Sequence, residues 1–345
     1  MPLQKLQFQP GINKESTSYA NEGGWFDCDK VRFRSGFPEK IGGWAKIGSN
    51  SFLGTCRALH PWRTLGLDLF LGMGTSSKYY IESGQGFYDI TPLRFTTAAG
   101  GATFAKVGNG DPTLTVADPS HGAVAGDFVT FSGAASLGSS ITAAILNQEY
   151  MIDSIVDSNS YKIRARAVAT VDSITVDGVY VPTTVNAAAG DSGNGGGSVV
   201  AAYQVSTGLN SSVFGTGWGA GTWSRLTWGS AASLTLTDVL RIWTHDNFGE
   251  DLIINVRDGD IYLWDASAAN PLTTRATSLA TRATALGLTG APTVATKVLV
   301  SDLDRHVIAF GADPVGDIGT QDPLLIRFSD QKNAFDWTPT TDNSA

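Results

Sequence analysis

Charged residues are scarce in this 345-residue sequence. Only 16% of the residues are Asp, Glu, Lys or Arg, whereas a soluble globular chain usually has about 25%. Acidic residues outnumber basic ones by 32 to 24, for a formal net charge of −8, which argues against a basic nucleic-acid-binding domain. Two explanations of the low charge stay open. Either part of the surface is buried in subunit contacts, whose cores are depleted of charge, or the chain is a β protein rich in Gly, Ser and Thr that stays soluble through hydroxyl groups and turns.

Long apolar runs and cysteines are also scarce. No run reaches the roughly 18 apolar residues that a membrane helix needs, and residues 1–10 lack the apolar core of a secretory signal. The sequence has two cysteines, Cys28 and Cys56, which form neither a disulfide scaffold nor a CxxC metal pair. We therefore expect a protein made in the cytoplasm, without membrane insertion.

Motifs for catalysis and cofactor binding are missing as well. The sequence contains no P-loop, no G-x-S-x-G and no G-x-G-x-x-G. His245 precedes Asp246, but adjacent residues on a strand point to opposite faces. None of the four histidines stands at a zinc-ligand spacing from another; they are His60, His121, His245 and His306. We predict that the protein is not an enzyme and has no catalytic residue, no metal site and no cofactor.

Acidic residues gather near two predicted turns without forming a calcium loop. Asp251, Asp258 and Asp260 flank one hairpin, and Asp302 and Asp304 flank another strand. Calcium loops need several oxygens within one short loop, commonly with a bidentate Glu. Turn chemistry alone explains Asp at these positions, so we predict no bound calcium.

Glycine, turns and short strands dominate the sequence. Glycine supplies 40 residues, above the usual share of about 7%. Three units, at 67–82, 251–264 and 306–328, share one plan: an apolar strand, a polar turn and a second strand. The second and third begin about 55 residues apart, near the roughly 40–50 residues of one propeller blade. We predict an all-β fold with a propeller-like platform of repeated hairpins; an ordinary β-sandwich is the alternative. Two short helices are expected at 140–148 and 272–286.

The composition changes between Phe95 and Tyr203. Tryptophan is absent there, while Ala, Gly, Ser, Thr and Val are frequent, and residues 187–197 have the composition of a flexible linker. We interpret this stretch as a small barrel-like or sandwich-like β module inserted into a loop of the platform. The predicted organisation is a platform at 1–94, an inserted module at 95–203 and the continued platform at 204–345.

Basic residues gather near the N-terminus. Lys30, Arg32 and Arg34 alternate with apolar residues, so a strand would carry the three cations on one face. They are candidate contacts for a phosphate group or an acidic partner. The other interpretation is a solvated strand face whose cations pair with acidic neighbours, namely Glu22, Asp27 or Glu39.

A glycine-rich stretch at 217–223 contains Trp218 and Trp223, and Trp228 follows it. Tryptophan is enriched at binding hot spots. We predict that these indoles anchor the loop to a neighbouring subunit; local core packing is the alternative for each of them.

Several segments resemble a known family. Residues 8–13, 21–36 and 38–44 are similar to the opening of short-tailed (podovirus-type) phage tail nozzle or hub proteins, some of which are called DNA-stabilisation or tail tubular proteins. Residues 217–223, 327–330 and 335–339 resemble that family too, so the resemblance covers about two-thirds of the chain. Segments within the inserted region resemble small β modules embedded in many phage tail proteins.

The resemblance implies a virion structural protein, assembled in the host cytoplasm and located in the tail. It implies a homo-oligomeric ring, expected to hold six copies, that extends the DNA channel below the portal and adaptor and retains DNA until ejection. The expected partners are the adaptor or portal, other tail proteins and passing double-stranded DNA, without sequence readout. A tail-associated receptor- or glycan-binding protein, acting through the inserted module, is the alternative.

Overall fold

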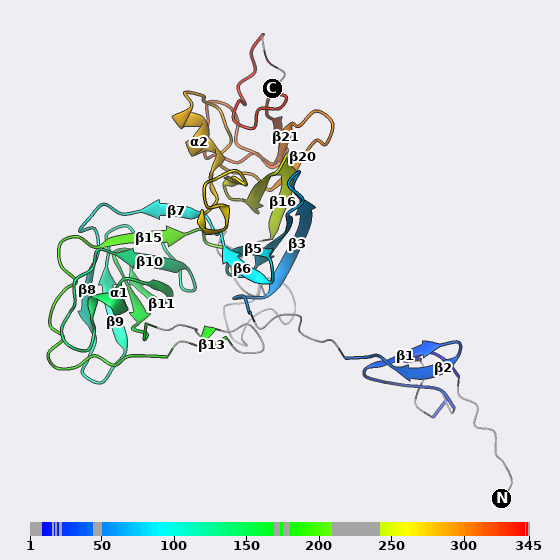
Figure 1. Cartoon of the computed structure of the whole chain (residues 1–345), viewed down its shortest axis with the longest axis horizontal. Helices are drawn as coiled ribbons and strands as arrows, with labels where there is room; N and C mark the ends of the chain where they lie inside the picture. Colours follow the sequence, from blue (N-terminus) through cyan, green and yellow to red (C-terminus); the bar gives the residue numbers. More distant parts are fainter. Residues whose placement is uncertain are drawn as a thin grey trace, which may run out of the picture. The chain divides into compact units, whose positions relative to one another are not determined.

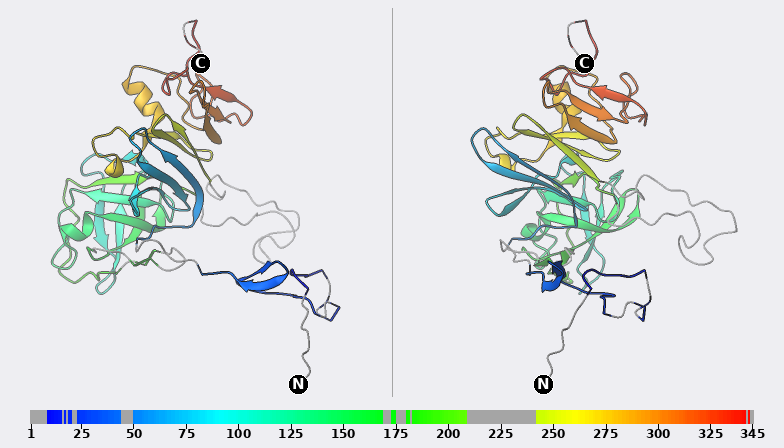
Figure 2. Two further views of the ribbon diagram at one scale, coloured as in Figure 1. Left: turned by 45° about the vertical axis from the view of Figure 1, so that its right-hand side comes forward. Right: turned by 90° about the vertical axis from the view of Figure 1, so that its right-hand side faces the viewer.

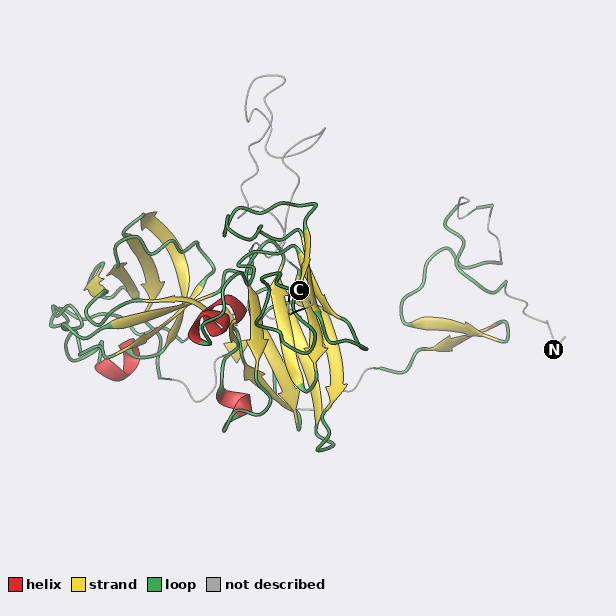
Figure 3. Ribbon diagram, turned by 90° about the horizontal axis from the view of Figure 1, so that it is seen from above, coloured by secondary structure: helices red, strands yellow, loops and turns green. Residues whose placement is uncertain are grey.

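The computed structural model describes residues 9–15, 17, 19–20, 23–43, 50–168, 173–174, 180–181, 183–208, 242–341 and 343. Strands in antiparallel sheets dominate these residues, and the helices among them are short (Figure 3). The predicted all-β fold is therefore confirmed. The chain divides into two compact units, residues 1–49 and 50–345. The predicted organisation into 1–94, 95–203 and 204–345 stays a prediction.

The described residues of the first unit include a hairpin. Strand β1 (Val31–Arg34) pairs with β2 (Phe37–Lys40), and the two central turn residues, Ser35 and Gly36, have φ values of 51° and 83°. Positive φ at both central residues suits the right-handed twist of a two-residue hairpin. The Trp25 and Phe33 rings lie edge to face with centroids 5.9 Å apart.

Among the described residues of the second unit, three sheets of three or four strands each follow chain order, the topology of a propeller blade. The first sheet consists of β3 (Cys56–Arg63), β4 (Leu69–Thr75), β5 (Tyr79–Ser83) and β6 (Gly86–Asp89). The second consists of β16 (Trp243–Phe248), β17 (Asp251–Val256), β18 (Ile261–Trp264) and β19 (Thr277–Ser278). The third consists of β20 (Lys297–Val300), β21 (Val307–Phe310) and β22 (Ile326–Phe328).

These sheets stack through their first strands. Strand β3 contacts β16, and β16 contacts β20, as the views in Figure 2 also show. Side chains of β16 bind the backbone of β20: the Val298 amide donates to Thr244 Oγ1 (3.2 Å), and the Val300 amide donates to Asp246 Oδ2 (2.9 Å). The second sheet is thus held directly against the third.

The second sheet is buried on both faces. Leu252 and Ile254 of β17 pack with Tyr79 of the first sheet, while Ile253 packs with Val298 of the third. Alternation along a strand sends neighbouring side chains to opposite faces, so a strand buried on both sides is a continuous apolar run. Each buried Leu or Ile contributes about 1.5–3 kcal/mol. A closed propeller stays a prediction, because the described residues supply three such sheets and a propeller has about four to eight blades.

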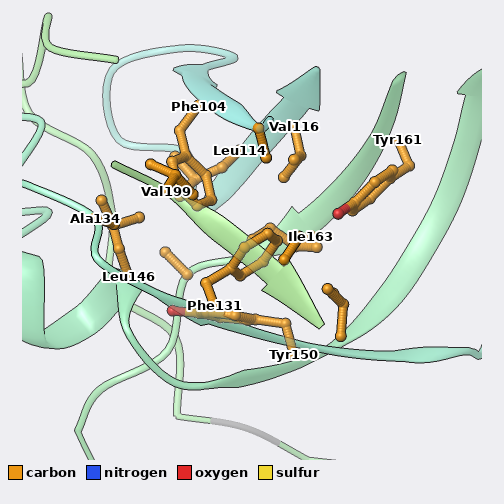
Figure 4. Packing of buried hydrophobic residues seen from close by; sticks show 14 of the residues in the cluster. Phe104, Leu114, Val116, Phe131, Ala134, Leu146, Tyr150, Tyr161, Ile163 and Val199 are labelled. Atoms are coloured by element: carbon orange, nitrogen blue, oxygen red, sulfur yellow. The ribbon is translucent and has the colours of Figure 1, made fainter. Parts of the chain in front are cut away.

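A seven-stranded sheet uses residues 93–204. Its strand order is β7-β15-β10-β11-β12-β9-β8, and the helix α1 (Ala143–Leu146) packs on its core through Ile145 and Leu146. Figure 4 shows that core, where Phe104, Phe131 and Tyr150 pack together. The strands are β7 (Leu93–Thr96), β8 (Thr103–Lys106), β9 (Thr113–Ala117), β10 (Phe128–Ser132), β11 (Glu149–Asp157), β12 (Ser160–Arg164) and β15 (Val200–Gln204).

The first and last strands of this sheet lie side by side. Strand β7 pairs with β15 through Thr96 opposite Ala202 (Figure 1), so the chain enters and leaves the sheet at neighbouring positions, as domain insertion requires. The predicted module boundaries at 95 and 203 stay a prediction. A separate two-stranded pair joins β13 (Ser173–Ile174) to β14 (Tyr180–Val181).

Outside the sheets, the described residues form two further short helices, the 3₁₀ helix η2 (Pro271–Thr273) and α2 (Leu279–Ala285). The Ser278 hydroxyl caps α2 by accepting the Thr281 amide at 3.3 Å.

Candidate functional sites

The basic N-terminal segment differs from the predicted row of three cations. Lys30 precedes β1 and has a φ of 58°, so strand alternation does not extend to it. Its Nζ lies 3.5 Å from Asp29 Oδ2, and both side chains are exposed. Only Arg32 and Arg34 share the exposed face of β1, because the turn residue Lys30 interrupts the extended backbone.

Two of the acidic neighbours form ion pairs, Glu39 within the hairpin and Asp27 outside it. Arg32 lies directly opposite Glu39, and its Nε donates to Glu39 Oε2 at 3.2 Å. Asp27 pairs with Lys14 at 3.1 Å, and the hydrogen bond and charge of Lys14 lower the pKa of Asp27. Arg34 has no ion pair with any residue that the structure describes. The ion pair with Glu39 supports the solvated-face interpretation for Arg32, and contact of Arg34 with an anionic partner stays a prediction.

The three candidate anchor tryptophans, Trp218, Trp223 and Trp228, lie outside the described residues. Their contact with a neighbouring subunit stays a prediction.

Two histidines meet where the first sheet packs on the second. His60 Nε2 lies 2.6 Å from Asn247 Oδ1, and His245 Nδ1 lies 2.8 Å from the Tyr79 hydroxyl. The two imidazole centroids are 5.0 Å apart. Burial, together with the charge of His60, lowers the pKa of His245 to about 4. His245 is therefore neutral at physiological pH, and Asp246 binds the third sheet instead of orienting this ring.

The remaining two histidines form hydrogen bonds with backbone groups. His121 Nε2 lies 3.0 Å from the Asp157 carbonyl while its Nδ1 accepts the Ala123 amide. His306 Nδ1 lies 2.7 Å from the Ser329 carbonyl. Within the described ranges, no three His, Cys, Asp or Glu side chains gather around a common point where a metal ion could bind.

The acidic residues of the hairpin at 251–264 accept hydrogen bonds from different backbone and side-chain groups. Asp251 accepts the Ala266 amide, Asp258 accepts the Thr296 hydroxyl, and Asp260 accepts the amide of the next residue. These carboxylates complete turns and connections between strands.

An ionic cluster of one buried and three partly buried side chains joins the seven-stranded sheet to the platform; we call it the ionic junction. It consists of Lys78, Asp89, Glu149 and Arg275. Lys78, whose side chain is 7% exposed, pairs with Glu149 and, at 2.8 Å, with Asp89. Arg275 lies 3.2 Å from Asp89 and 3.5 Å from Glu149. The sequence interpretation missed this cluster.

Each partner of the ionic junction comes from a different element. Lys78 precedes β5, Asp89 ends β6, Glu149 begins β11 and Arg275 lies between η2 and β19. Glu149 also accepts a hydrogen bond from the Gln204 side-chain amide. Its carboxylate is therefore bound by Lys78 and Arg275 of the platform and by Gln204 of its own sheet. The cluster thereby links the seven-stranded sheet to the first two platform sheets.

The charges in the ionic junction balance. Burial alone would lower the pKa of Lys78, but the Glu149 and Asp89 carboxylates outweigh it and raise that pKa above its usual value. Burial opposes ionisation of Asp89 too, yet Lys78 and Arg275 lower the pKa of this carboxyl. Lys78 and Asp89 are therefore both charged at neutral pH. An apolar contact lies beside them, since Phe128 packs with Leu53, Met73 and Tyr80.

Comparisons with known proteins give little further guidance. No family model matches the sequence, and no curated protein matches it. Among solved structures, the chain is similar to the phage phi92 endosialidase at a TM-score of 0.20 and 11% identity, over 79% of this chain. The chain spans 36% of that protein's length. Similarity at this level establishes neither a shared activity nor a shared site.

No helix of the described residues has the length and hydropathy to cross a membrane.

Proposed function

We propose that this protein is a structural component of a phage tail, a nozzle or hub that forms a ring around the DNA path and retains DNA until ejection. The observation that carries the proposal is the stack of three meander sheets, in which the second is buried on both faces. Such packing gives a rigid scaffold, and the ionic junction fixes the seven-stranded sheet to it. The resemblance of residues 8–13, 21–36 and 38–44 to podovirus-type nozzle proteins supports the same role.

Electrostatics support a conduit for DNA. Each chain carries a net charge of −8, so a ring multiplies the negative charge around its channel. Acidic walls repel phosphates and let a duplex slide without adhering, over a range of about 8–10 Å at physiological salt. The expected neighbours are the adaptor or portal, other tail proteins and further copies of this chain.

The alternative, recognition of a receptor or glycan by residues 95–203, requires exposed aromatic side chains that can stack on sugars. Six of the aromatic residues in this stretch are buried in the core or against the platform, whereas Phe95 is 49% exposed. The six are Phe104, Phe128, Phe131, Tyr150, Tyr161 and Tyr203. This burial favours the scaffold. A glycan array with the full-length protein separates the two functions: specific glycan binding supports the alternative, and its absence supports the scaffold.

The direct test of the proposed function locates the protein in particles. Phage particles are labelled with gold-conjugated antibodies against the purified protein and examined by electron microscopy. We expect label at the tail below the portal. Label on the capsid alone, or particles without any of this protein, would overturn the proposal.

A further inference from the structure

The stack of platform sheets leaves exposed apolar side chains on its outer side at each end. The first sheet turns the side chains of Ala58 and Trp62 toward the second sheet, so Leu59 and the residues beside it point the other way. We call this outer surface the first face. It carries Leu59 and Leu69, which are 57% and 70% exposed. The cross-strand register places Arg63 opposite Leu69, and Pro61 and Glu82 on either side of Leu71. Further along the same side, Met73 and Tyr80 are covered by Leu53 and Phe128.

The third sheet has a similar outer surface, the last face. Its strands turn Val298 and Ala309 toward the second sheet, and the alternate residues form cross-strand rows on the other side. One row joins Leu299, Ile308 and Phe328, and the other joins Lys297, Phe310 and Ile326. Ile326 and Phe328 are 56% and 45% exposed.

The last face has the composition of an interface core. Five of the six positions in the two rows of the last face are apolar, and interface cores are depleted of charge. The last face also ends at β22, which has a hydrogen-bonded neighbour only on its β21 side among the described strands. Exposed edges and apolar sheet faces invite association unless they are covered.

The chain itself shows how such a face is covered. Within one copy, the stacking step is used twice: the second sheet covers the inner side of the first, and the third sheet covers the far side of the second. In both steps, the first strand of one sheet lies against the first strand of the next. Repeating this step past the third sheet requires a sheet with exposed apolar side chains on its outer side, and the first face supplies them.

We propose that the last face of one copy packs on the first face of a second copy. The two faces differ, so the contact is head-to-tail, and it closes into a ring when the rotation between copies closes. This inference rests on the proposed function, because it names the contact through which the ring assembles. It predicts that each copy uses both faces, with one neighbour on each.

The test uses one substitution on each face of the full chain. Leu69→Glu places a charge on the first face and Ile326→Glu places one on the last face. Leu286→Glu is the matched control, since Leu286 is 63% exposed at the end of α2 and belongs to neither face. Sedimentation velocity measures association of each variant alone and of an equimolar mixture.

The proposal predicts a complementation pattern. Wild type and Leu286→Glu associate, whereas Leu69→Glu and Ile326→Glu are each monomeric, because every contact needs one intact face of each kind. Their mixture forms a 1:1 dimer and nothing larger, through the intact last face of the first variant and the intact first face of the second. Circular dichroism confirms folding; a variant that unfolds is replaced by Leu59→Gln or Phe328→Gln on the same face.

Three results would overturn the proposal. Association of either variant alone would mean that the faces pair with themselves or that another surface is used, and a mixture that stays monomeric would show that the faces do not meet. A wild-type chain that is monomeric at all concentrations would contradict it as well. The gold-labelling experiment is independent of all three, so a tail location with intact rings in both variants would refute this interface and keep the proposed function.

Discussion

Lys78 and Glu149, separated by 71 residues in the sequence, form an ion pair that connects the platform to the seven-stranded sheet. Asp89 and Arg275 complete the cluster, so two cations and two carboxylates share one partly buried site. Breaking a buried pair by removing one partner leaves an uncompensated charge, which costs more than the pair itself contributes. The ionic junction therefore makes the attachment of this sheet sensitive to single substitutions.

We expect Lys78→Met to lower the free energy of unfolding by about 3–5 kcal/mol, since Asp89 and Glu149 lose the more buried of their two shared cations and keep only Arg275. The control is Arg164→Met, which removes the exposed pair with Asp153 at 3.1 Å and should cost about 1 kcal/mol or less. Urea denaturation measures both. Equal losses in the two variants would show that the ionic junction contributes no more than a surface pair.

The packing of the first sheet on the second depends on Gly74. A Cβ at this position would lie 2.6 Å from Cγ of Trp243, whose indole nitrogen donates to the Thr75 carbonyl at 2.8 Å. We expect Gly74→Ala to destabilise the protein by about 1–3 kcal/mol through overpacking. Gly190→Ala is the control, because nothing lies within 4 Å of its added Cβ. Similar melting temperatures for the two variants would contradict this packing.

His245 makes stability depend on pH. Its pKa falls from 6.5 to about 4 on folding, so the stabilisation is present above the unfolded value and is lost as the pH falls through 6.5 toward 4. The loss is about 3 kcal/mol, from 1.36 kcal/mol per pKa unit. We expect His245→Gln to flatten the decline in stability between pH 6.5 and 4, measured by urea denaturation. An unchanged decline would contradict the neutral buried imidazole.

Asp260 has the opposite effect in the same pH range. Burial, with the nearby Asp313, raises its pKa from 3.8 to about 6. A raised carboxyl pKa gives stability that is present below 3.8 and is lost as the pH rises through 6. We expect Asp260→Asn to remove that loss, so that the variant gains stability relative to wild type as the pH rises from 4 to 7. The Asp258→Asn variant, in the preceding turn, serves as a comparison.

The predicted tryptophan anchor is tested in particles. We expect the double substitution Trp218→Ala and Trp223→Ala to release the protein from tails, because hot-spot tryptophans each contribute about 2 kcal/mol or more. Sedimentation of particles after mild salt treatment, with quantification of the released protein, measures the effect. Complete, DNA-filled tails that sediment like wild type would rule out an anchoring role.

Local patterns in the sequence predicted local structure well. The Asp258-Gly259 turn lies between β17 and β18 as expected, and Asp258 has a φ of 56°. The apolar runs at 251–256 and 261–264 form strands buried on both faces. The helix expected at 140–148 is present in shorter form as α1, and the one expected at 272–286 is divided between η2, β19 and α2, since Thr277 and Ser278 pair with β18.

Contacts between distant segments could not be predicted in this way. Lys78, Asp89, Glu149 and Arg275 have no short spacing that marks them as partners, and only the folded sheets bring them together. The row of three cations failed for a local reason, because Lys30 adopts a positive φ just before the strand. The exposure of the apolar faces could not be predicted either. Alternation along a strand does not distinguish exposed apolar residues such as Leu59 and Ile326 from core positions.

The central claim is that this chain builds a ring from copies of itself. Mass photometry of the purified full-length protein tests it most directly, because each copy adds 36.3 kDa. We predict a discrete species at a whole multiple of that mass, six copies being expected, which negative-stain images resolve as a ring with an axial channel. A single species at 36.3 kDa at every concentration tested would contradict the account.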